Sequence, residues 1–349
     1  MTSGRRSRSL NERELRLWKV GRALVLTFVA AVLVAGGVFY GLVVLLDFQE
    51  IDTTAKLDAK TLFDLVKLSF GVVAGAGALV ALVVAYRRQR VDEAGAHREA
   101  TRLHTERFSQ AVEQLGSDSP AVRLGGVHAL AGLADDAPEP GLRQTCIDVL
   151  CAYLRLPYTP DPGEDPAHLE EHQRYLALRE VRHTILRLIG EHYQRPQGTQ
   201  RSWQGSYLDL TGVTFDVDLM SFKGAVFAGS TVSFRGATFS DGMVSFNGAV
   251  FSAGKVNFAG ATFSGGMVFF SKAVLSDGVN FYQAVFSDGT VDFGGATFSG
   301  DVLFADARFS NCTVRFDNAT GPAPQGLLAA VGTPAPAEVV LPTSWLPSP

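Results

Sequence analysis

Residues 232–241 read Val-Ser-Phe-Arg-Gly-Ala-Thr-Phe-Ser-Asp, two boxes of five residues that each centre on a phenylalanine. Similar boxes continue on both sides, so a large apolar residue recurs at alternating gaps of seven and five, with six twice in place of seven. A fixed period over about a hundred residues is typical of a solenoid, in which each unit must stack on its neighbours to bury its apolar face. The eighteen recurring positions, all phenylalanine except one leucine, are Phe215, Phe222, Phe227, Phe234, Phe239, Phe246, Phe251, Phe258, Phe263, Phe270, Leu275, Phe281, Phe286, Phe293, Phe298, Phe304, Phe309 and Phe316.

The box length of five predicts how these residues are arranged. It fits neither the 3.6-residue period of a helix nor the two-residue period of a flat strand, so the chain must turn a corner after each short extended segment. In such a segment Val232 and Phe234 point to the same side, and the residue between them points out. We therefore expect an interior ladder of phenylalanines. Burial of each is worth about 1.5 to 3 kcal/mol, which explains the ladder by stability alone.

The boxes resemble the pentapeptide repeat family, whose unit is a small residue, a variable residue, a central Leu or Phe, and two more. The resemblance covers about residues 207–319 and implies a right-handed β-helix with a quadrilateral cross-section. Two extra residues follow most pairs of boxes here, so we expect two looser or bulged corners in each coil. The ladder ends at Gly321, which occupies the place of the next phenylalanine.

Two uncharged stretches, 23–46 and 68–86, are each long enough to cross a hydrocarbon core of about 30 Å. The first is too long for the core of a signal peptide, so we interpret it as a retained anchor. The alternative for either stretch is a buried helix of a soluble domain. Because no charge lies within them, an ion or proton path is not expected.

Basic residues flank both stretches, and the positive-inside rule then places both termini in the cytoplasm. This predicts a multi-pass protein of the cell (inner) membrane that contacts lipid through two transmembrane helices. Small residues four apart in the second stretch favour packing of the two spans as a hairpin, with self-association of two chains as the alternative. The basic residues predicted to face the membrane surface are Arg16, Lys19, Arg22, Arg87, Arg88 and Arg90.

The predicted fold class is multi-domain, α plus β-solenoid. Apolar stripes at helical spacing predict an α-helical module before the solenoid. Residues 107–130 resemble a helical segment that often accompanies bacterial membrane-anchored pentapeptide repeat proteins. The predicted divisions are a basic cytoplasmic tail (1–22), a two-helix transmembrane hairpin (23–88), a cytoplasmic α-helical module (89–195), the pentapeptide-repeat β-helix (205–320) and a Pro-rich C-terminal tail (321–349).

The C-terminal tail contains seven of the fifteen prolines of the chain, and this composition predicts flexibility. Leu327, Leu328 and Val331 are candidates to lie across the open end of the solenoid, because a terminal coil needs a cap. Trp345 is the residue of this segment that hints at a docking motif.

Candidate catalytic residues are few. Residues 168–172 match the H-x-x-E-H zinc pattern, and His168 and His172 would then share a metal on one helical face. The competing interpretation is a solvated helix start, where acids are favoured by the helix dipole. Cys146, Cys151 and Cys312 lack the spacing of a metal or redox pair and fit a reducing cytoplasm. We therefore predict no enzyme activity, metal or cofactor, and the alternative is a metal-dependent hydrolase that uses His168 and His172.

Some pentapeptide repeat proteins mimic DNA and bind topoisomerases, so the resemblance implies a DNA-mimic alternative. Residues 201–319 carry ten acids and seven bases, which is sparse beside a DNA helix with one charge per roughly 1.7 Å. Direct nucleic-acid binding is not expected, because the solenoid has no basic stripe and the whole chain has a net charge of −4. The leading prediction is a membrane-anchored, non-enzymatic scaffold that presents the β-helix to an unknown protein partner.

Overall fold

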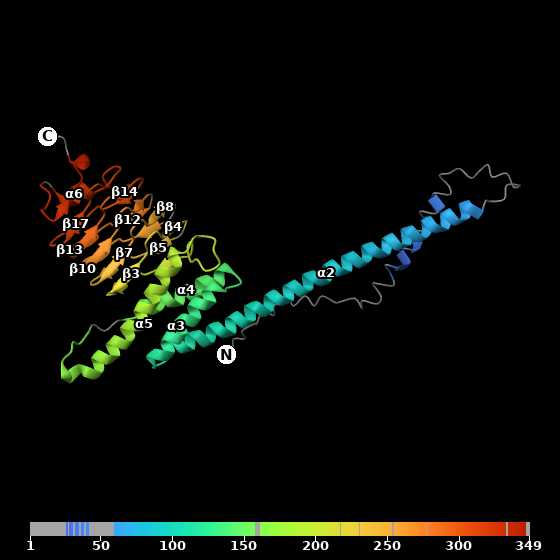
Figure 1. The fold of residues 1–349 in the computed structure, drawn as a ribbon, viewed down its shortest axis with the longest axis horizontal. Helices are drawn as coiled ribbons and strands as arrows, with labels where there is room; N and C mark the ends of the chain where they lie inside the picture. The colour runs from blue at the N-terminus through green and yellow to red at the C-terminus, as the bar shows by residue number, and fades with distance from the viewer. Residues whose placement is uncertain are drawn as a thin grey trace, which may run out of the picture. The chain divides into compact units, whose positions relative to one another are not determined.

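In the computed structural model, the described residues are 26, 28–30, 32–34, 36–37, 40–41 and 59–346, except 158–160, 217, 230, 253–254, 277 and 333. The chain divides into two compact units, 1–98 and 99–349. The described residues among 26–41 are helical, and helix α2 (Ala59–Leu115) follows (Figure 1).

Helix α2 is the one helix in the described part of the chain that is long and apolar enough to cross a membrane, over a stretch that starts at Phe70. Phe70, Leu79 and Leu82 are exposed large apolar side chains of this stretch. It contains most of the predicted second span. The predicted first span lies largely outside the described residues, so the two-span hairpin and its topology stay predictions.

The second unit begins with a helical module. The end of α2 is followed by α3 (Pro120–Asp135), α4 (Pro140–Leu154), the short 3₁₀ helix η2 (Pro166–His168) and α5 (Leu169–Gln194). Proline stands at the start of α3 and α4, where its missing N–H is not needed. Helices are therefore found in the region where apolar periodicity predicts them. Their shared core includes Val127, Leu130, Ile147, Leu150, Ile185 and Ile189.

A parallel β-solenoid follows, and its short strands form three hydrogen-bonded sheets. The first sheet contains β1 (Leu208–Asp209), β5 (Thr231–Ser233), β9 (Lys255–Asn257), β12 (Val279–Asn280) and β15 (Val302–Leu303). The second contains β2 (Thr214–Phe215), β3 (Leu219–Ser221), β6 (Thr238–Phe239), β7 (Met243–Ser245), β10 (Thr262–Phe269), β13 (Val285–Asp292), β16 (Arg308–Phe309), β17 (Thr313–Arg315) and β18 (Val339–Val340). The third contains β4 (Val226–Ala228), β8 (Val250–Ser252), β11 (Val274–Leu275) and β14 (Thr297–Phe298).

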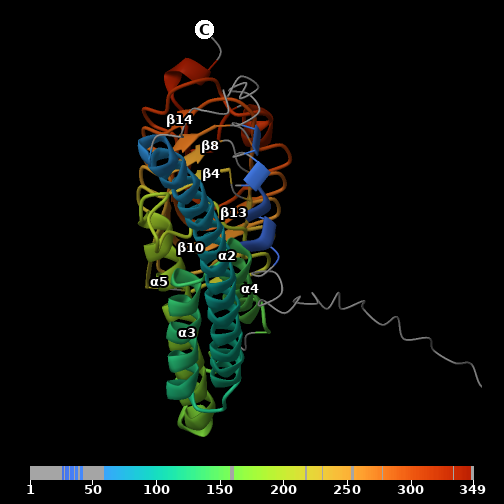
Figure 2. The ribbon, with the colours of Figure 1, turned by 90° about the vertical axis from the view of Figure 1, so that its right-hand side faces the viewer.

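The register of these strands explains the spacing of the ladder. Phe215, Phe239, Phe263, Phe286 and Phe309 are neighbours in successive coils. One coil is therefore 24 or 23 residues long and holds four ladder positions, and each gap of six shortens its coil by one residue. The solenoid has about five coils, which Figure 2 shows stacked in chain order from yellow to red.

The interior is a ladder of stacked phenylalanine rings. Along the face that starts at Phe215, ring centroids are 4.7 to 4.8 Å apart and adjacent rings are within 9° of parallel. Such pairs add about 0.5 to 1.5 kcal/mol each beyond the burial of their area. Every ladder residue is buried except Phe309, which is half-buried. The register between β10 and β13 shifts on both sides of Ser264, which is a bulged corner of the kind expected from the inserted residues.

The helical module closes the first end of the solenoid. The Tyr193 ring at the end of α5 stacks on Phe227, with centroids 5.3 Å apart, and meets Phe222 edge-on. Gly190 lies so close to the first coil that a Cβ atom there would be 2.7 Å from the Ser221 carbonyl oxygen. Helix α5 therefore packs directly on the ladder.

The C-terminal tail closes the other end, so the expectation that it is flexible is wrong. It contains α6 (Leu327–Val331), β18, which pairs in parallel with β17, and the 3₁₀ helix η3 (Thr343–Trp345). Leu327 and Val331 are buried, as predicted for a cap, whereas Leu328 is exposed. The tail is ordered because it supplies backbone partners and apolar side chains to the last coil, which offset the entropy cost of ordering it.

Candidate interaction surfaces and polar clusters

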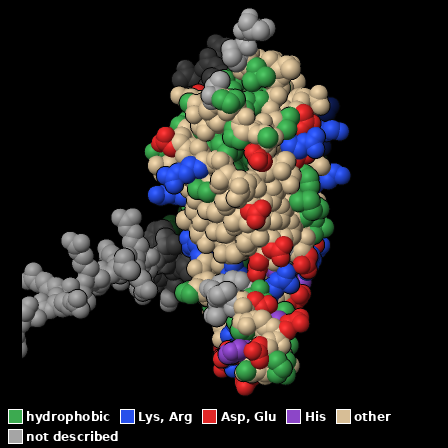
Figure 3. Space-filling view, turned by 90° about the vertical axis from the view of Figure 1, so that its left-hand side faces the viewer, with side chains coloured by type: hydrophobic (Ala, Val, Ile, Leu, Met, Phe, Trp, Pro, Cys, Tyr) green, Lys and Arg blue, Asp and Glu red, His purple; other side chains and the backbone are tan. Residues whose placement is uncertain are grey.

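The outer wall of the solenoid is mostly neutral and polar. Its outward positions are largely Ser, Thr, Asn and Gly, with scattered charges. Figure 3 shows one side of the molecule, on which hydrophobic side chains gather near the C-terminal end and along one edge. Much of the remaining wall is tan, the colour of uncharged polar side chains, glycine and backbone. A surface of this kind has no general attraction for polyanions. Local departures from this pattern are therefore the candidate interaction sites of the wall.

One departure is an exposed apolar column on strands β3, β7 and β10 of the second sheet. Leu219, Met243 and Met267 are register neighbours in three successive coils. Leu219 is 61% exposed and Met267 is 42% exposed, and Met243 is half-buried. Phe269 lies two residues beyond Met267 on the same strand and is half-buried. We call these four residues the apolar column. Such a patch on a polar surface is a mark of protein contact sites.

The apolar column stops half-way along the solenoid. In the next two coils the same register position is occupied by Thr290 and Thr313. The sequence analysis did not identify this column, because it followed the inward positions of the five-residue boxes. The signal is the residue three before a ladder phenylalanine, which is apolar before Phe222, Phe246 and Phe270. It becomes visible once the repeat is read as 24 residues rather than five.

The structure places the two predicted metal-binding histidines against different carboxylates. His168 Nδ1 lies 3.2 Å from Glu171 Oε2, and His172 Nδ1 lies 2.6 Å from Asp161 Oδ1. A backbone hydrogen bond from Gly163, and then His172, lower the pKa of Asp161. His168 ends η2 rather than standing within α5. Among the described residues, no group of three or more potential ligands could hold a metal ion. These contacts of His168 and His172 are explained as structural interactions that hold the preceding loop at the start of α5.

A Cys–His contact that spacing could not reveal lies inside the helical module. Cys146 Sγ is 3.9 Å from His104 Nε2, although the two residues are 42 positions apart. Burial raises the pKa of Cys146 to about 11 and lowers the pKa of His104. Both shifts disfavour a thiolate–imidazolium pair, which nucleophilic chemistry needs. Burial likewise raises the pKa of Cys151 to about 12 and that of Cys312 to about 11.

A buried polar cluster joins α3, α5 and the segment before the solenoid. Asp135 accepts a hydrogen bond from the Trp203 indole N–H at 3.0 Å and lies 3.2 Å from His192 Nε2. His192 Nδ1 is 2.6 Å from the Leu188 carbonyl oxygen, and its ring stacks on Trp203 with centroids 4.1 Å apart. Each of these polar groups has a partner, so the cluster is explained as a structural joint.

The predicted membrane-facing basic residues are described in part. Arg87, Arg88 and Arg90 are exposed on α2 directly after its apolar stretch, and the Arg90 guanidinium lies 5.6 Å from the centre of the Tyr86 ring. The predicted basic residues before the first span, Arg16, Lys19 and Arg22, lie outside the described residues.

Neither a model of a protein family, nor a curated protein, nor a solved structure matches this chain. The assignment of the fold therefore rests on the geometry of the chain itself. That geometry is a parallel β-solenoid of about five coils with a stacked phenylalanine ladder, preceded by helices.

Proposed function

We propose that this chain is a membrane-anchored, non-enzymatic interaction protein of the pentapeptide repeat family, with a right-handed β-helix that binds a protein partner at the cytoplasmic face. The observation that carries the proposal is the apolar column, in which Leu219 and Met267 are exposed on a mostly polar wall. Leaving large apolar side chains in water has no benefit for the isolated fold. A partner that covers them would gain the free energy of their burial.

The closed ends of the solenoid favour the same conclusion. Tyr193 covers the first coil, and Trp345 covers the last. Because open strand edges are what allow solenoids and sheets to join end to end, the two caps disfavour assembly along the axis. Recognition is then left to the lateral wall, whose interior is a ladder of buried phenylalanines with Leu275 in one place.

The anchor is supported by the apolar stretch of α2 and by the basic residues that follow it. A helix with exposed Phe70, Leu79 and Leu82 is stable in lipid, where these side chains need no protein partner. Arg87 and Arg88 would then lie in the zone where basic side chains are attracted to anionic headgroups. The solenoid would then lie on the side that the positive-inside rule assigns to the cytoplasm.

The test is affinity capture from native membranes with the full-length chain and two matched variants. Met267→Glu puts a charge into the apolar column, and Thr313→Glu puts the same charge into the same register column outside it. We expect a partner that the wild-type chain and Thr313→Glu retain and that Met267→Glu loses. A partner captured equally by all three chains would locate recognition elsewhere and remove the apolar column from the account.

A further inference from the structure

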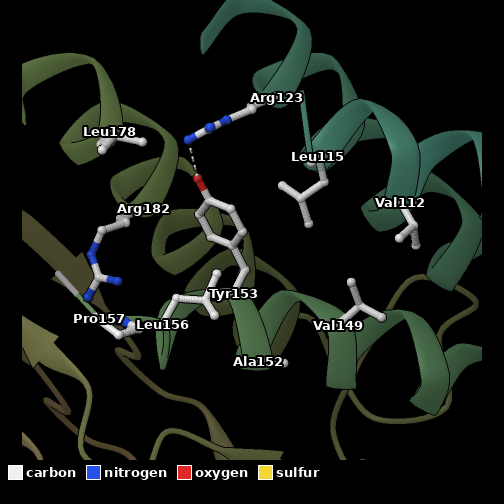
Figure 4. A pocket seen from close by; sticks show the side chains of 11 residues that line it. Val112, Leu115, Arg123, Val149, Ala152, Tyr153, Leu156, Pro157, Leu178 and Arg182 are labelled. Atoms are coloured by element: carbon white, nitrogen blue, oxygen red, sulfur yellow. Dashed lines mark hydrogen bonds between the residues drawn. The ribbon is translucent and has the colours of Figure 1, made fainter. Parts of the chain in front are cut away.

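A pocket of about 500 Å³ lies in the helical module, between the end of α2 and helices α3, α4 and α5 (Figure 4). Pockets of about 300 to 1,000 Å³ are the size range of small-molecule sites. This pocket is lined within the second unit alone, and neither the phenylalanine ladder nor the apolar column contributes to it. It is therefore a separate feature that the proposed function does not use.

Most of the lining is apolar. Val112 and Leu115 come from α2, Val149 from α4 and Leu178 from α5. Figure 4 shows Val112, Leu115 and Val149 on one side of the pocket and Leu178 on the other. Such a lining favours a ligand with an apolar body.

Two polar side chains, Arg123 and Tyr153, meet beside this apolar space, and Arg182 lies apart from them (Figure 4). Arg123 donates to the Ser117 carbonyl oxygen through Nε, and its Nη1 lies 3.4 Å from the Tyr153 hydroxyl. Among the described residues, the second terminal nitrogen of Arg123, Nη2, has no hydrogen-bond partner. The Arg123 guanidinium also forms no ion pair with a described residue. Arg182, which is 4% exposed, donates to the carbonyl oxygens of Leu154 at 2.7 Å and Thr214 at 3.3 Å.

The charged side chains that line this pocket are all positive. It contains two guanidinium groups and no carboxylate. A cation in apolar surroundings loses hydration, and an anion held by charge-assisted hydrogen bonds offsets that loss. The planar guanidinium suits a carboxylate, because two of its N–H groups can meet both carboxylate oxygens.

We propose that this pocket binds a long-chain carboxylate. Its carboxylate would accept hydrogen bonds from Arg123 and the Tyr153 hydroxyl. Its hydrocarbon chain would lie along Leu115 and Val149. A single anionic head with an apolar body is the chemistry that matches Arg123, Tyr153 and the apolar lining together.

The test uses the full-length chain in nanodiscs of zwitterionic phosphatidylcholine, with radiolabelled palmitate as the ligand. Binding is measured as the excess over empty nanodiscs, so that partition into lipid is subtracted. Hexadecanol, which has the same chain length without the charge, serves as the second ligand. We expect saturable binding of one palmitate per chain, and binding of hexadecanol at least about tenfold weaker.

Three variants locate the site. Arg123→Gln removes the cation and should weaken palmitate binding by about tenfold or more, and Ala152→Phe places a ring in the pocket and should abolish it. Arg187→Gln makes the same charge change at an exposed position of α5 that does not line the pocket, and it should leave palmitate binding unchanged. Circular dichroism checks that each variant is folded. Equal binding of palmitate and hexadecanol, no excess binding by the wild-type chain, or full binding by folded Ala152→Phe would overturn the proposal.

Discussion

The indole N–H of Trp345 donates a hydrogen bond to the carbonyl oxygen of Gly321 at 2.9 Å. Gly321 stands where the third face of the ladder would have its next phenylalanine, one coil after Phe298. The Trp345 ring meets Phe298 at 5.5 Å and Phe316 at 5.6 Å between centroids. An aromatic ring from 24 residues later in the chain therefore covers the end of the ladder beyond Phe298.

Trp345→Ala should destabilise the C-terminal end of the solenoid. Removing a buried tryptophan leaves a cavity over Phe298 and Phe316, which costs about 3 to 5 kcal/mol in free energy of unfolding. The measurement is chemical unfolding of the full chain, together with hydrogen exchange of the Val314 amide, which donates to the Glu338 carbonyl oxygen. Trp345→Phe is the matched control, and it should keep most of the stability. Unchanged exchange of Val314 in Trp345→Ala would show that the tail does not depend on the indole.

Gly321→Ala should be more harmful than a similar change at Gly236. Both glycines have positive φ, +91° and +61°, which costs an alanine about 1 to 2 kcal/mol. A Cβ atom at Gly321 would also overlap the Phe298 carbonyl oxygen, whereas at Gly236 it would meet nothing within 4 Å. We expect losses of unfolding free energy of about 2 to 5 kcal/mol for Gly321→Ala and about 1 to 2 kcal/mol for Gly236→Ala. Equal losses of unfolding free energy in the two variants would mean that the backbone of the last coil shifts to relieve the overlap at little cost.

Gly190→Ala tests the contact between α5 and the first coil. A Cβ atom there would lie 2.7 Å from the Ser221 carbonyl oxygen, so the helix must move away from the solenoid. Overpacking of this kind costs about 1 to 3 kcal/mol. The control is Gly132→Ala in α3, where a Cβ atom meets nothing within 4 Å and helix propensity predicts a gain of up to about 1 kcal/mol. Thermal unfolding should therefore shift in opposite directions for the two variants, and a shared direction would contradict the close packing.

Cys151 should contribute a pH dependence to stability. Burial raises the pKa of its thiol from an ordinary value near 9 to about 12. Between these values the unfolded chain loses the proton and the folded chain keeps it, so this contribution is complete below pH 9 and is lost as pH rises toward 12. The slope is at most about 1.4 kcal/mol per pH unit, and Cys151→Ala should remove it from unfolding measured at pH 8, 9 and 10. Val181→Ala, a buried change without a proton, should keep the wild-type slope.

The repeat is a part of the fold that the sequence could predict well. The ladder spacing indicated the inward phenylalanines, the small residues beside them and the bulged corners, because these follow from local geometry that repeats in every coil. Leu327 was also predicted as a residue that covers the open end of the solenoid, and it is buried.

The contacts between distant segments could not be predicted from the sequence. Nothing near Trp345 in the sequence indicates that its ring would cover Phe298, and a Pro-rich composition pointed to flexibility instead. The Arg123–Tyr153 and Cys146–His104 contacts likewise depend on how helices pack, which periodicity does not specify. The apolar column was visible in principle, but only with the 24-residue coil known.

The central claim is that the solenoid wall, through its apolar column, is the recognition surface. Its most direct test is photocrosslinking in native membranes with a crosslinking amino acid placed in the full-length chain at position 267, 313 or 187. The account predicts a crosslinked protein band from 267 that is absent from the exposed helix position 187 and weaker from 313. A band that forms from 187 but not from 267 would contradict it and assign recognition to the helical module.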